Sequence, residues 1–121
     1  MGTIVTWPGA SGTSYRTELF PIGTQFNAVS GVYILCASTS PDRWTALYVG
    51  ETQSLYDRLN ANPGAHDGIV CASGCGATHI AVMRADGDAL RLLVETDLRH
   101  SLNPPCNKQS VPAKTIADIL G

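Results

Sequence analysis

Two short apolar runs that lie close together constrain the fold of this chain more than any other feature. The run GVYILCA at 31–37 and the run TALYVG at 45–50 are rich in β-branched and aromatic residues, which favour β-strands. Turn-forming residues, among them Pro41, separate the two runs. Strands joined so closely pair most simply as an antiparallel hairpin, so the sequence predicts a β-hairpin over 31–50.

The segments that follow this hairpin are predicted from hydrophobic periodicity. Residues 52–61 are expected to form a helix, because Leu55 and Leu59 share one helical face and Thr52 can cap the first turn. The glycine-rich stretch 62–76 is expected to be a loop. A third strand is predicted over 78–85.

A second and longer helix is predicted over 88–102, where apolar residues recur at helical spacing. The residues of this expected apolar stripe are Leu90, Leu93, Val94, Leu98 and Leu102. Residues 1–30 are expected to form an added N-terminal β-hairpin, and residues 110–121 a short closing helix. The predicted class is α+β: a small antiparallel sheet with the core order β-β-α-β-α over 31–109, flanked by helices.

The composition bounds the partners and the location of the chain. With 121 residues, 44% apolar and 15% charged, it is expected to be one globular domain. The net charge of −2 argues against a broad basic face for nucleic acid but leaves room for a small positive site. No run resembles a membrane span or a secretory signal, so a cytoplasmic protein without membrane contact is expected.

Four cysteines leave several interpretations open. Their even number allows disulfides, but thiols stay reduced in the intracellular context expected here. Cys71, Cys75 and the nearby His79 suggest zinc binding or a redox pair as alternatives. A structural or incidental role for Cys36, Cys71, Cys75 and Cys106 is favoured over both.

The triplets GVY at 31–33 and YVG at 48–50 resemble the paired signature of the GIY-YIG nuclease superfamily. Members of this superfamily carry a small polar residue, a leucine and an arginine after the second triplet, then a glutamate on the next long helix, and a proline and an asparagine beyond it. The corresponding residues here are Thr52, Leu55, Arg58, Glu95, Pro105 and Asn107. The resemblance thus covers about residues 31–107, in order.

The resemblance implies hydrolysis of phosphodiester bonds. Arg58 would meet the charge of the phosphate with a planar fork of donors. Glu95 would hold Mg²⁺ (or Mn²⁺), which prefers hard oxygen ligands. Tyr33 or Tyr48 would accept the proton of the attacking water, and an ordinary phenol pKa of about 10 would have to be lowered for that role. Asn107 would orient the site.

Glycines and the helix start add a candidate substrate-binding segment. Gly50 ends the second strand, where a missing side chain lets backbone approach a phosphate. Thr52 lies at the expected helix N-terminus, which favours anions. Gly31, the first residue of the other triplet, completes the predicted substrate-binding set.

Three features depart from the family pattern. The gap between the two tyrosines is longer than usual, which predicts an enlarged loop around Pro41–Trp44. Glu51 stands where many members have a basic residue and should repel phosphate. Asn62 stands where many members have a histidine, so His66 in the following loop is the candidate for that role.

The favoured function is therefore a Mg²⁺-dependent endonuclease of low sequence specificity, with DNA favoured over RNA. A chain this small contacts few phosphates, so a homodimer or a protein partner is expected to help. The alternatives are a non-catalytic module that binds nucleic acid or a protein, and a toxin-type nuclease with an immunity partner.

Overall fold

The structure is a computed structural model that describes residues 2–109. The predicted helix at 110–121 lies outside the described residues. The strands are β1 (Thr3–Pro8), β2 (Ser14–Pro21), β3 (Gly31–Ser40), β4 (Arg43–Thr52) and β5 (His79–Arg84). The helices are the π-helix η1 (Asp57–Ala61), the 3₁₀-helix η2 (Pro63–Ala65), α1 (Asp67–Gly74), α2 (Asp88–Leu102) and α3 (Pro105–Gln109).

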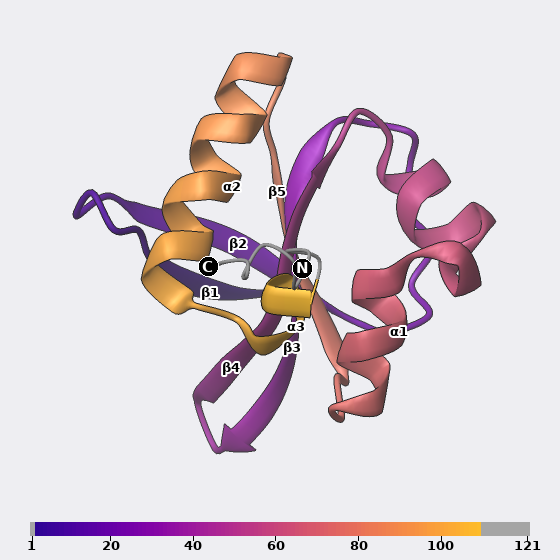
Figure 1. Cartoon of the computed structure of the whole chain (residues 1–121), viewed down its shortest axis with the longest axis horizontal. Helices are drawn as coiled ribbons and strands as arrows, with labels where there is room; N and C mark the ends of the chain where they lie inside the picture. The colour runs from indigo at the N-terminus through magenta and orange to yellow at the C-terminus, as the bar shows by residue number, and fades with distance from the viewer. Residues whose placement is uncertain (1, 110–121) are drawn as a thin grey trace, which may run out of the picture.

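All five described strands form one antiparallel sheet in the order β1-β2-β5-β3-β4. This arrangement confirms the predicted α+β class. The N-terminal hairpin is part of the same sheet, because β2 pairs with β5. The strand β4 lies at the opposite edge (Figure 1).

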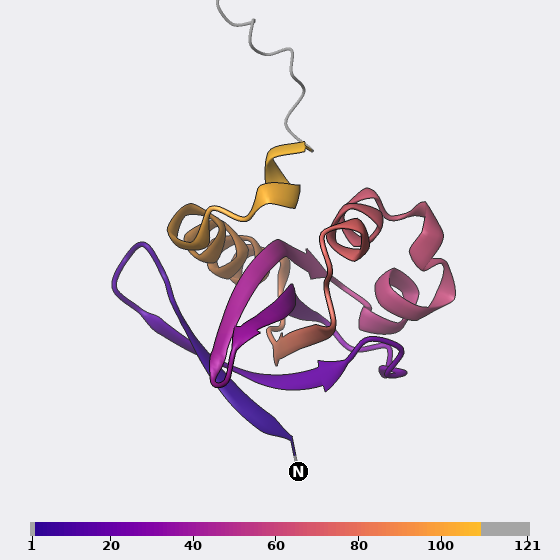
Figure 2. The ribbon, with the colours of Figure 1, turned by 90° about the horizontal axis from the view of Figure 1, so that it is seen from below.

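Helices cover both faces of the sheet. Figure 1 shows α2 on one side of the central strands and α1 on the other. Side chains alternate along β3, so Val32, Ile34 and Cys36 pack toward α2 while Tyr33 and Leu35 pack toward η1 and α1. The short helix α3 lies against both β4 and α1 (Figure 2).

The loop predicted to be enlarged between the two central strands is instead a tight turn. The strands continue to Ser40 and resume at Arg43, and these two residues pair directly. Pro41 and Asp42 make the turn, with Asp42 at φ 65°. Register shifts after Leu35 and after Ser38 absorb the extra residues as bulges. The long gap between the tyrosines therefore lengthens the hairpin.

The helix after β4 begins later than predicted. Thr52 is the last residue of β4 and does not cap the helix, since its hydroxyl oxygen accepts from the Ser54 backbone N–H at 3.1 Å. The Ser54 hydroxyl oxygen accepts from the Asp57 backbone N–H at 3.2 Å. Ser54 therefore supplies the side-chain bond expected of Thr52.

The stretch 62–76 is not the loop that its glycines suggested. It contains η2 and the eight-residue helix α1. The His66 side chain caps α1 by accepting a hydrogen bond from the Gly68 backbone N–H. An imidazole cap is outside the usual capping residues, which explains why the sequence pattern did not reveal it.

The predicted bounds of the long helix match α2, but its buried face is different. Leu90 and Leu93 are 47% and 65% exposed, whereas Arg91 is 4% exposed. The Arg91 Nε lies 2.9 Å from a carboxylate oxygen of Glu51, and the same guanidinium contacts Asp88. Because this paired charge is buried, the buried face of α2 differs from the predicted apolar stripe. Val94 and Leu98 are the residues of that stripe that are buried.

A disulfide joins Cys71 on α1 to Cys106 on α3. The expectation of four reduced thiols is therefore wrong for this pair, while Cys36 and Cys75 are free. The fold brings the two Cα atoms to 5.7 Å although 35 residues separate them, a distance at which cysteines can bond. Only the packing of α3 against α1 creates that proximity.

Asp97 on α2 anchors the N-terminal hairpin. One carboxylate oxygen accepts from the Ser11 backbone N–H at 2.8 Å, and the other accepts from the Ser11 and Tyr15 hydroxyls at 2.6 and 2.7 Å. These bonds, led by those of Ser11, hold the pKa of Asp97 below its ordinary value. The hairpin is thus tied to α2 by an ionised carboxylate.

We expect Asp97→Asn to lower the melting temperature, with a gap to wild type that depends on pH. The folded-state pKa lies below the unfolded value of about 3.9, so the stabilisation is present above that pH and is lost as the pH falls through the folded-state pKa. Thermal melts of both proteins between about pH 3 and pH 7 test this window. Tyr15→Phe should show part of the loss, and a gap that does not change with pH would contradict the anchor.

Candidate active site

The Tyr33 side chain on β3 meets the imidazole of His66 in the core below α1. Tyr33 is fully buried, and its Oη lies 2.6 Å from His66 Nε2. The other ring nitrogen, Nδ1, accepts from the Gly68 N–H at 3.1 Å. A neutral imidazole therefore carries its hydrogen on Nε2 and donates it to the Tyr33 oxygen. Burial, followed by the Arg58 charge, lowers the pKa of His66, which favours this neutral form.

Arg58 extends from η1 to the same phenol. Its guanidinium lies close enough to the Tyr33 oxygen to interact with it, so an imidazole and a cation from two different elements face one phenol. Burial raises the pKa of Tyr33, the neighbouring Tyr48 raises it further, and Arg58 opposes both effects. The net direction is upward, so the Tyr33 phenol keeps its proton at neutral pH.

Tyr48 on β4 stands beside this group and is half-buried. Its ring centroid lies 6.2 Å from that of Tyr33 and 5.3 Å from that of His66. Burial raises the pKa of Tyr48, Arg58 and Arg99 lower it, and the carboxylates of Glu95 and Glu51 raise it. The net direction is upward, so the Tyr48 phenol is a weaker acid than an ordinary tyrosine.

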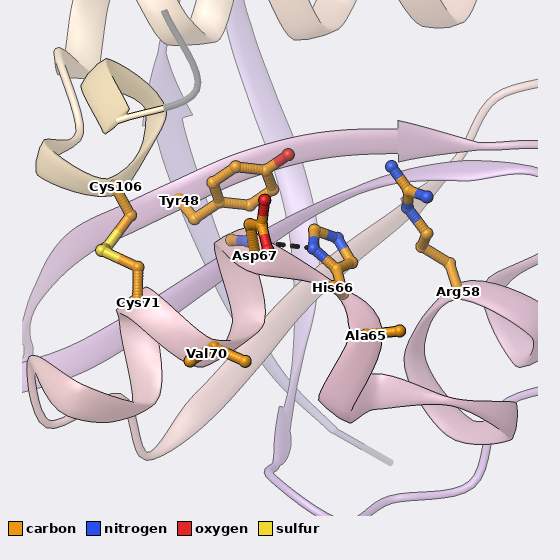
Figure 3. A pocket seen from close by; sticks show the side chains of 9 residues that line it. Tyr48, Arg58, Ala65, His66, Asp67, Val70, Cys71 and Cys106 are labelled. Carbon is orange, nitrogen blue, oxygen red and sulfur yellow. Dashed lines mark hydrogen bonds between the residues drawn. A yellow bond between two sulfur atoms is a disulfide. The ribbon is translucent and has the colours of Figure 1, made fainter. Parts of the chain in front are cut away.

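A cleft of about 500 Å³ opens over these side chains. Figure 3 shows the Tyr48 hydroxyl and the Arg58 guanidinium on the same side of it, with the His66 ring between them. Asp67 and the Cys71–Cys106 disulfide complete this part of the lining. Arg58 is exposed, so its remaining donors can reach a ligand in the cleft.

Glycines make room for the two phenols. Gly50 pairs with Tyr33 across the hairpin, and a Cβ at Gly50 would lie 2.4 Å from both the Cζ and the Oη of Tyr33. A Cβ at Gly68 would lie 2.5 Å from Cε1 of Tyr48. Packing against tyrosine, not the approach of a phosphate to the backbone, is the reason that the structure gives for glycine at both positions.

None of the three residues of the predicted substrate-binding set, Gly31, Gly50 and Thr52, lines the cleft. Gly31 pairs with Thr52 and Arg84 in the sheet. A Cβ at Gly31 would lie 2.6 Å from the Met83 carbonyl oxygen, so close packing against β5 explains this glycine. The Thr52 hydroxyl bonds to the Ser54 backbone.

Asn107 on α3 bonds to the sheet edge beside the cleft. Its amide oxygen accepts from the Val49 N–H at 2.7 Å, and its amide nitrogen donates to the Val49 carbonyl at 2.9 Å. Val49 lies between Tyr48 and Gly50 on the edge strand, so this pair of bonds satisfies backbone groups that no further strand can reach. Asn107 thus fixes the backbone that carries Tyr48.

Glu95 lies on the α2 side of the sheet, outside the cleft. It lies on α2, its side chain is 13% exposed, and its Oε2 is 3.1 Å from the Arg99 Nε. Burial raises the pKa of Glu95, Arg99 lowers it and Glu51 raises it. Its charge acts on Tyr48, but Glu95 is not part of the cleft lining. The structure therefore gathers Tyr33, Tyr48, Arg58 and His66 and leaves Glu95 beyond them.

Two contributions to this site were not predicted from the sequence. Gly68 both donates to His66 and makes room for Tyr48. Glu51, which was expected to repel phosphate, forms an ion pair with Arg91. The segment HDGIVCA at 66–72 has no usual capping residue at its start, so no local signal indicated the helix or the role of Gly68.

Comparisons with known proteins give no relative from which the roles of the site residues could be taken. No family model, no curated protein and no solved structure matches the chain. Among residues 2–109, no helix is long and apolar enough to cross a membrane. Within the same residues, the one cluster of at least three potential metal-ligating side chains is Cys71, Cys75 and Cys106.

Proposed function

We propose that this chain is an endonuclease of the GIY-YIG type that hydrolyses phosphodiester bonds of nucleic acid, with DNA as the preferred substrate and little sequence specificity. One observation carries the proposal. The Tyr33 oxygen bonds to His66 and lies near the Arg58 cation, next to a half-buried second phenol in an open cleft. Paired phenols held by an arginine and a neutral imidazole suit the handling of a phosphate and a water.

Arg58 is the proposed phosphate ligand. Its guanidinium interacts with Tyr33, and the exposed side chain lines the cleft. A planar guanidinium matches two phosphate oxygens at once. The negative charge that builds up during phosphoryl transfer is therefore met by a positioned cation.

Tyr48 is the proposed base, and Tyr33 is the proposed positioning residue. The Tyr33 phenol is fully buried and its oxygen bonds to His66, so an attacking water has little access to it. Tyr48 lines the cleft; burial raises its pKa, and the charges of Arg58 and Arg99 offset part of that rise. His66 cannot act as the base, since both ring nitrogens already have partners.

Glu95 is the proposed ligand of Mg²⁺ (or Mn²⁺). Burial and the Glu51 charge disfavour the ionised form of Glu95, the Arg99 charge favours it, and a bound cation would favour it further. A single carboxylate suits Mg²⁺, which keeps several waters and also binds substrate phosphate. When bound, the ion would supply positive charge for the departing oxygen.

We expect the wild-type protein to nick supercoiled plasmid in the presence of Mg²⁺, and Glu95→Ala to be slower by a factor of about 10² or more. Calorimetric titration of Mg²⁺ should show binding that Glu95→Ala loses. Glu18→Ala, which removes a carboxylate on β2, is the matched control and should keep both properties.

Plasmid and single-stranded RNA that both stay intact with wild-type protein, over varied salt and metal, would overturn the hydrolase proposal. Retarded migration of intact plasmid in the same experiment would then identify a binding module. Cleavage of RNA alone would keep the hydrolase and overturn the preference for DNA.

A further inference from the structure

Three cysteine sulfurs gather at the end of α1. The Sγ atoms of Cys71, Cys75 and Cys106 all lie within 4.8 Å of one another. Cys71 and Cys106 are bonded, and Cys75 is a free, exposed thiol. An accessible thiol that lies beside a disulfide is the arrangement that thiol–disulfide exchange requires.

We propose that these residues form a thiol–disulfide exchange centre in which Cys75 displaces Cys106 from Cys71. The Cys75 thiolate attacks the Cys71 sulfur, a Cys71–Cys75 bond forms, and the Cys71–Cys106 bond breaks. The electron pair leaves on the Cys106 sulfur, which takes a proton from water. One disulfide and one thiol are present before and after the step, so no external oxidant or reductant is needed.

Access decides which sulfur is attacked. Cys71 is half-buried, whereas Cys106 is 2% exposed. An exposed thiol therefore approaches Cys71 more easily, with Cys106 as the leaving group. Residues four apart on a helix have Cα atoms about 6 Å apart, within the range that a disulfide spans. Cys75 is the C-cap of α1, and its backbone N–H donates to the Cys71 carbonyl at 3.0 Å, which keeps the two cysteines close together.

The exchange changes what holds α3 in place. In the native pairing, the disulfide ties α3 to α1 and lines the cleft. Cys106 directly precedes Asn107, whose side chain holds Val49 next to Tyr48. After exchange, α3 keeps the Asn107 bonds but loses its covalent link to α1. The proposal does not depend on hydrolysis, because it rests on the three sulfurs alone.

The test uses the oxidised full chain in the presence of a chelator. After incubation at about pH 8.5, where ordinary cysteine thiols are partly ionised, free thiols are blocked with N-ethylmaleimide at acidic pH. Trypsin leaves Cys71 and Cys75 together in residues 59–84 and Cys106 in residues 100–108. Exchange predicts a released 100–108 peptide that carries the label, besides the disulfide-linked pair of peptides.

Labelling of Cys106 should be at least about tenfold faster in wild type than in Cys75→Ser, while Cys36→Ser, which removes the buried free thiol, should behave like wild type. In Cys106→Ser, mild oxidation should form a Cys71–Cys75 bond, and this variant does not need the native disulfide to form. Wild type that keeps only the linked peptides, or Cys106→Ser that forms no such bond while folded, would overturn the proposal.

Discussion

Replacement of Arg58 by alanine is expected to reduce plasmid nicking by a factor of about 10²–10³, the usual cost of removing one positioned donor from a transition state. The structure supplies the reason, because this guanidinium interacts with Tyr33 and lines the cleft together with Tyr48. Arg58→Lys should recover only part of the activity, since an ammonium group lacks the planar fork that matches two phosphate oxygens. Initial rates measured with excess substrate test both variants.

The same substitution has a readout that does not require activity. The Arg58 charge lowers the pKa of His66, so Arg58→Ala should raise that pKa, which a pH titration of the imidazole by NMR measures directly. Arg84→Ala is the matched control, because Arg84 is an exposed arginine on β5 that pairs with Asp86. A higher pKa with unchanged nicking would support the geometry and contradict the proposed role of Arg58. An unchanged pKa would contradict the geometry itself.

The strands and the long helix could be predicted because their signals are local. The runs at 31–37 and 45–50 are apolar and β-branched, and the structure confirms the hairpin that they predict. The bounds of α2 were also predictable, since Asp88 follows a break at Gly87 and Asn103 adopts the left-handed conformation that ends the helix. Local patterns therefore located most of the elements.

The buried face of α2 and the helix α1 could not be predicted, because both depend on partners that are distant in the sequence. Arg91 is buried only because Glu51 on β4 meets its guanidinium. α1 is capped by an imidazole that Tyr33 holds from the other side. The Cys71–Cys106 bond follows from the same kind of long-range packing. Each of these features requires the tertiary structure that the local pattern does not contain.

For the candidate site, the order of the motif residues along the chain predicted which side chains come together, whereas the chemistry of each residue taken alone did not. Tyr33, Tyr48 and Arg58 come from three elements, and the structure brings them together through the register of β3 and β4. The separation of Glu95 from that group was not visible in the sequence, because it depends on which face of the sheet α2 covers. Charged groups from both layers therefore act on Tyr48 at the edge strand, and Glu95 does so from the α2 side.

Gly50 offers the sharpest test of this arrangement. The added Cβ of Gly50→Ala would lie 2.4 Å from Tyr33 Cζ and Oη, and the ring cannot move cheaply because it is fully buried and bonded to His66. Overpacking of this kind costs about 1–3 kcal/mol of unfolding free energy. We also expect nicking to fall to background, since the displaced phenol would disturb the neighbouring Tyr48 and Arg58 side chains. Urea denaturation measures the loss, and Gly64→Ala, whose Cβ would meet nothing within 4 Å, is the matched control.

A double-mutant cycle then assigns the cost to the contact with Tyr33. Tyr33→Leu removes the two atoms that the new Cβ would strike while it keeps an apolar side chain in the core. In that background Gly50→Ala should cost much less than in wild type, so the coupling free energy should be about 1 kcal/mol or more. An equal cost in the two backgrounds would mean that the glycine serves the strand alone. Contact with the Tyr33 phenol would then not explain the glycine at position 50.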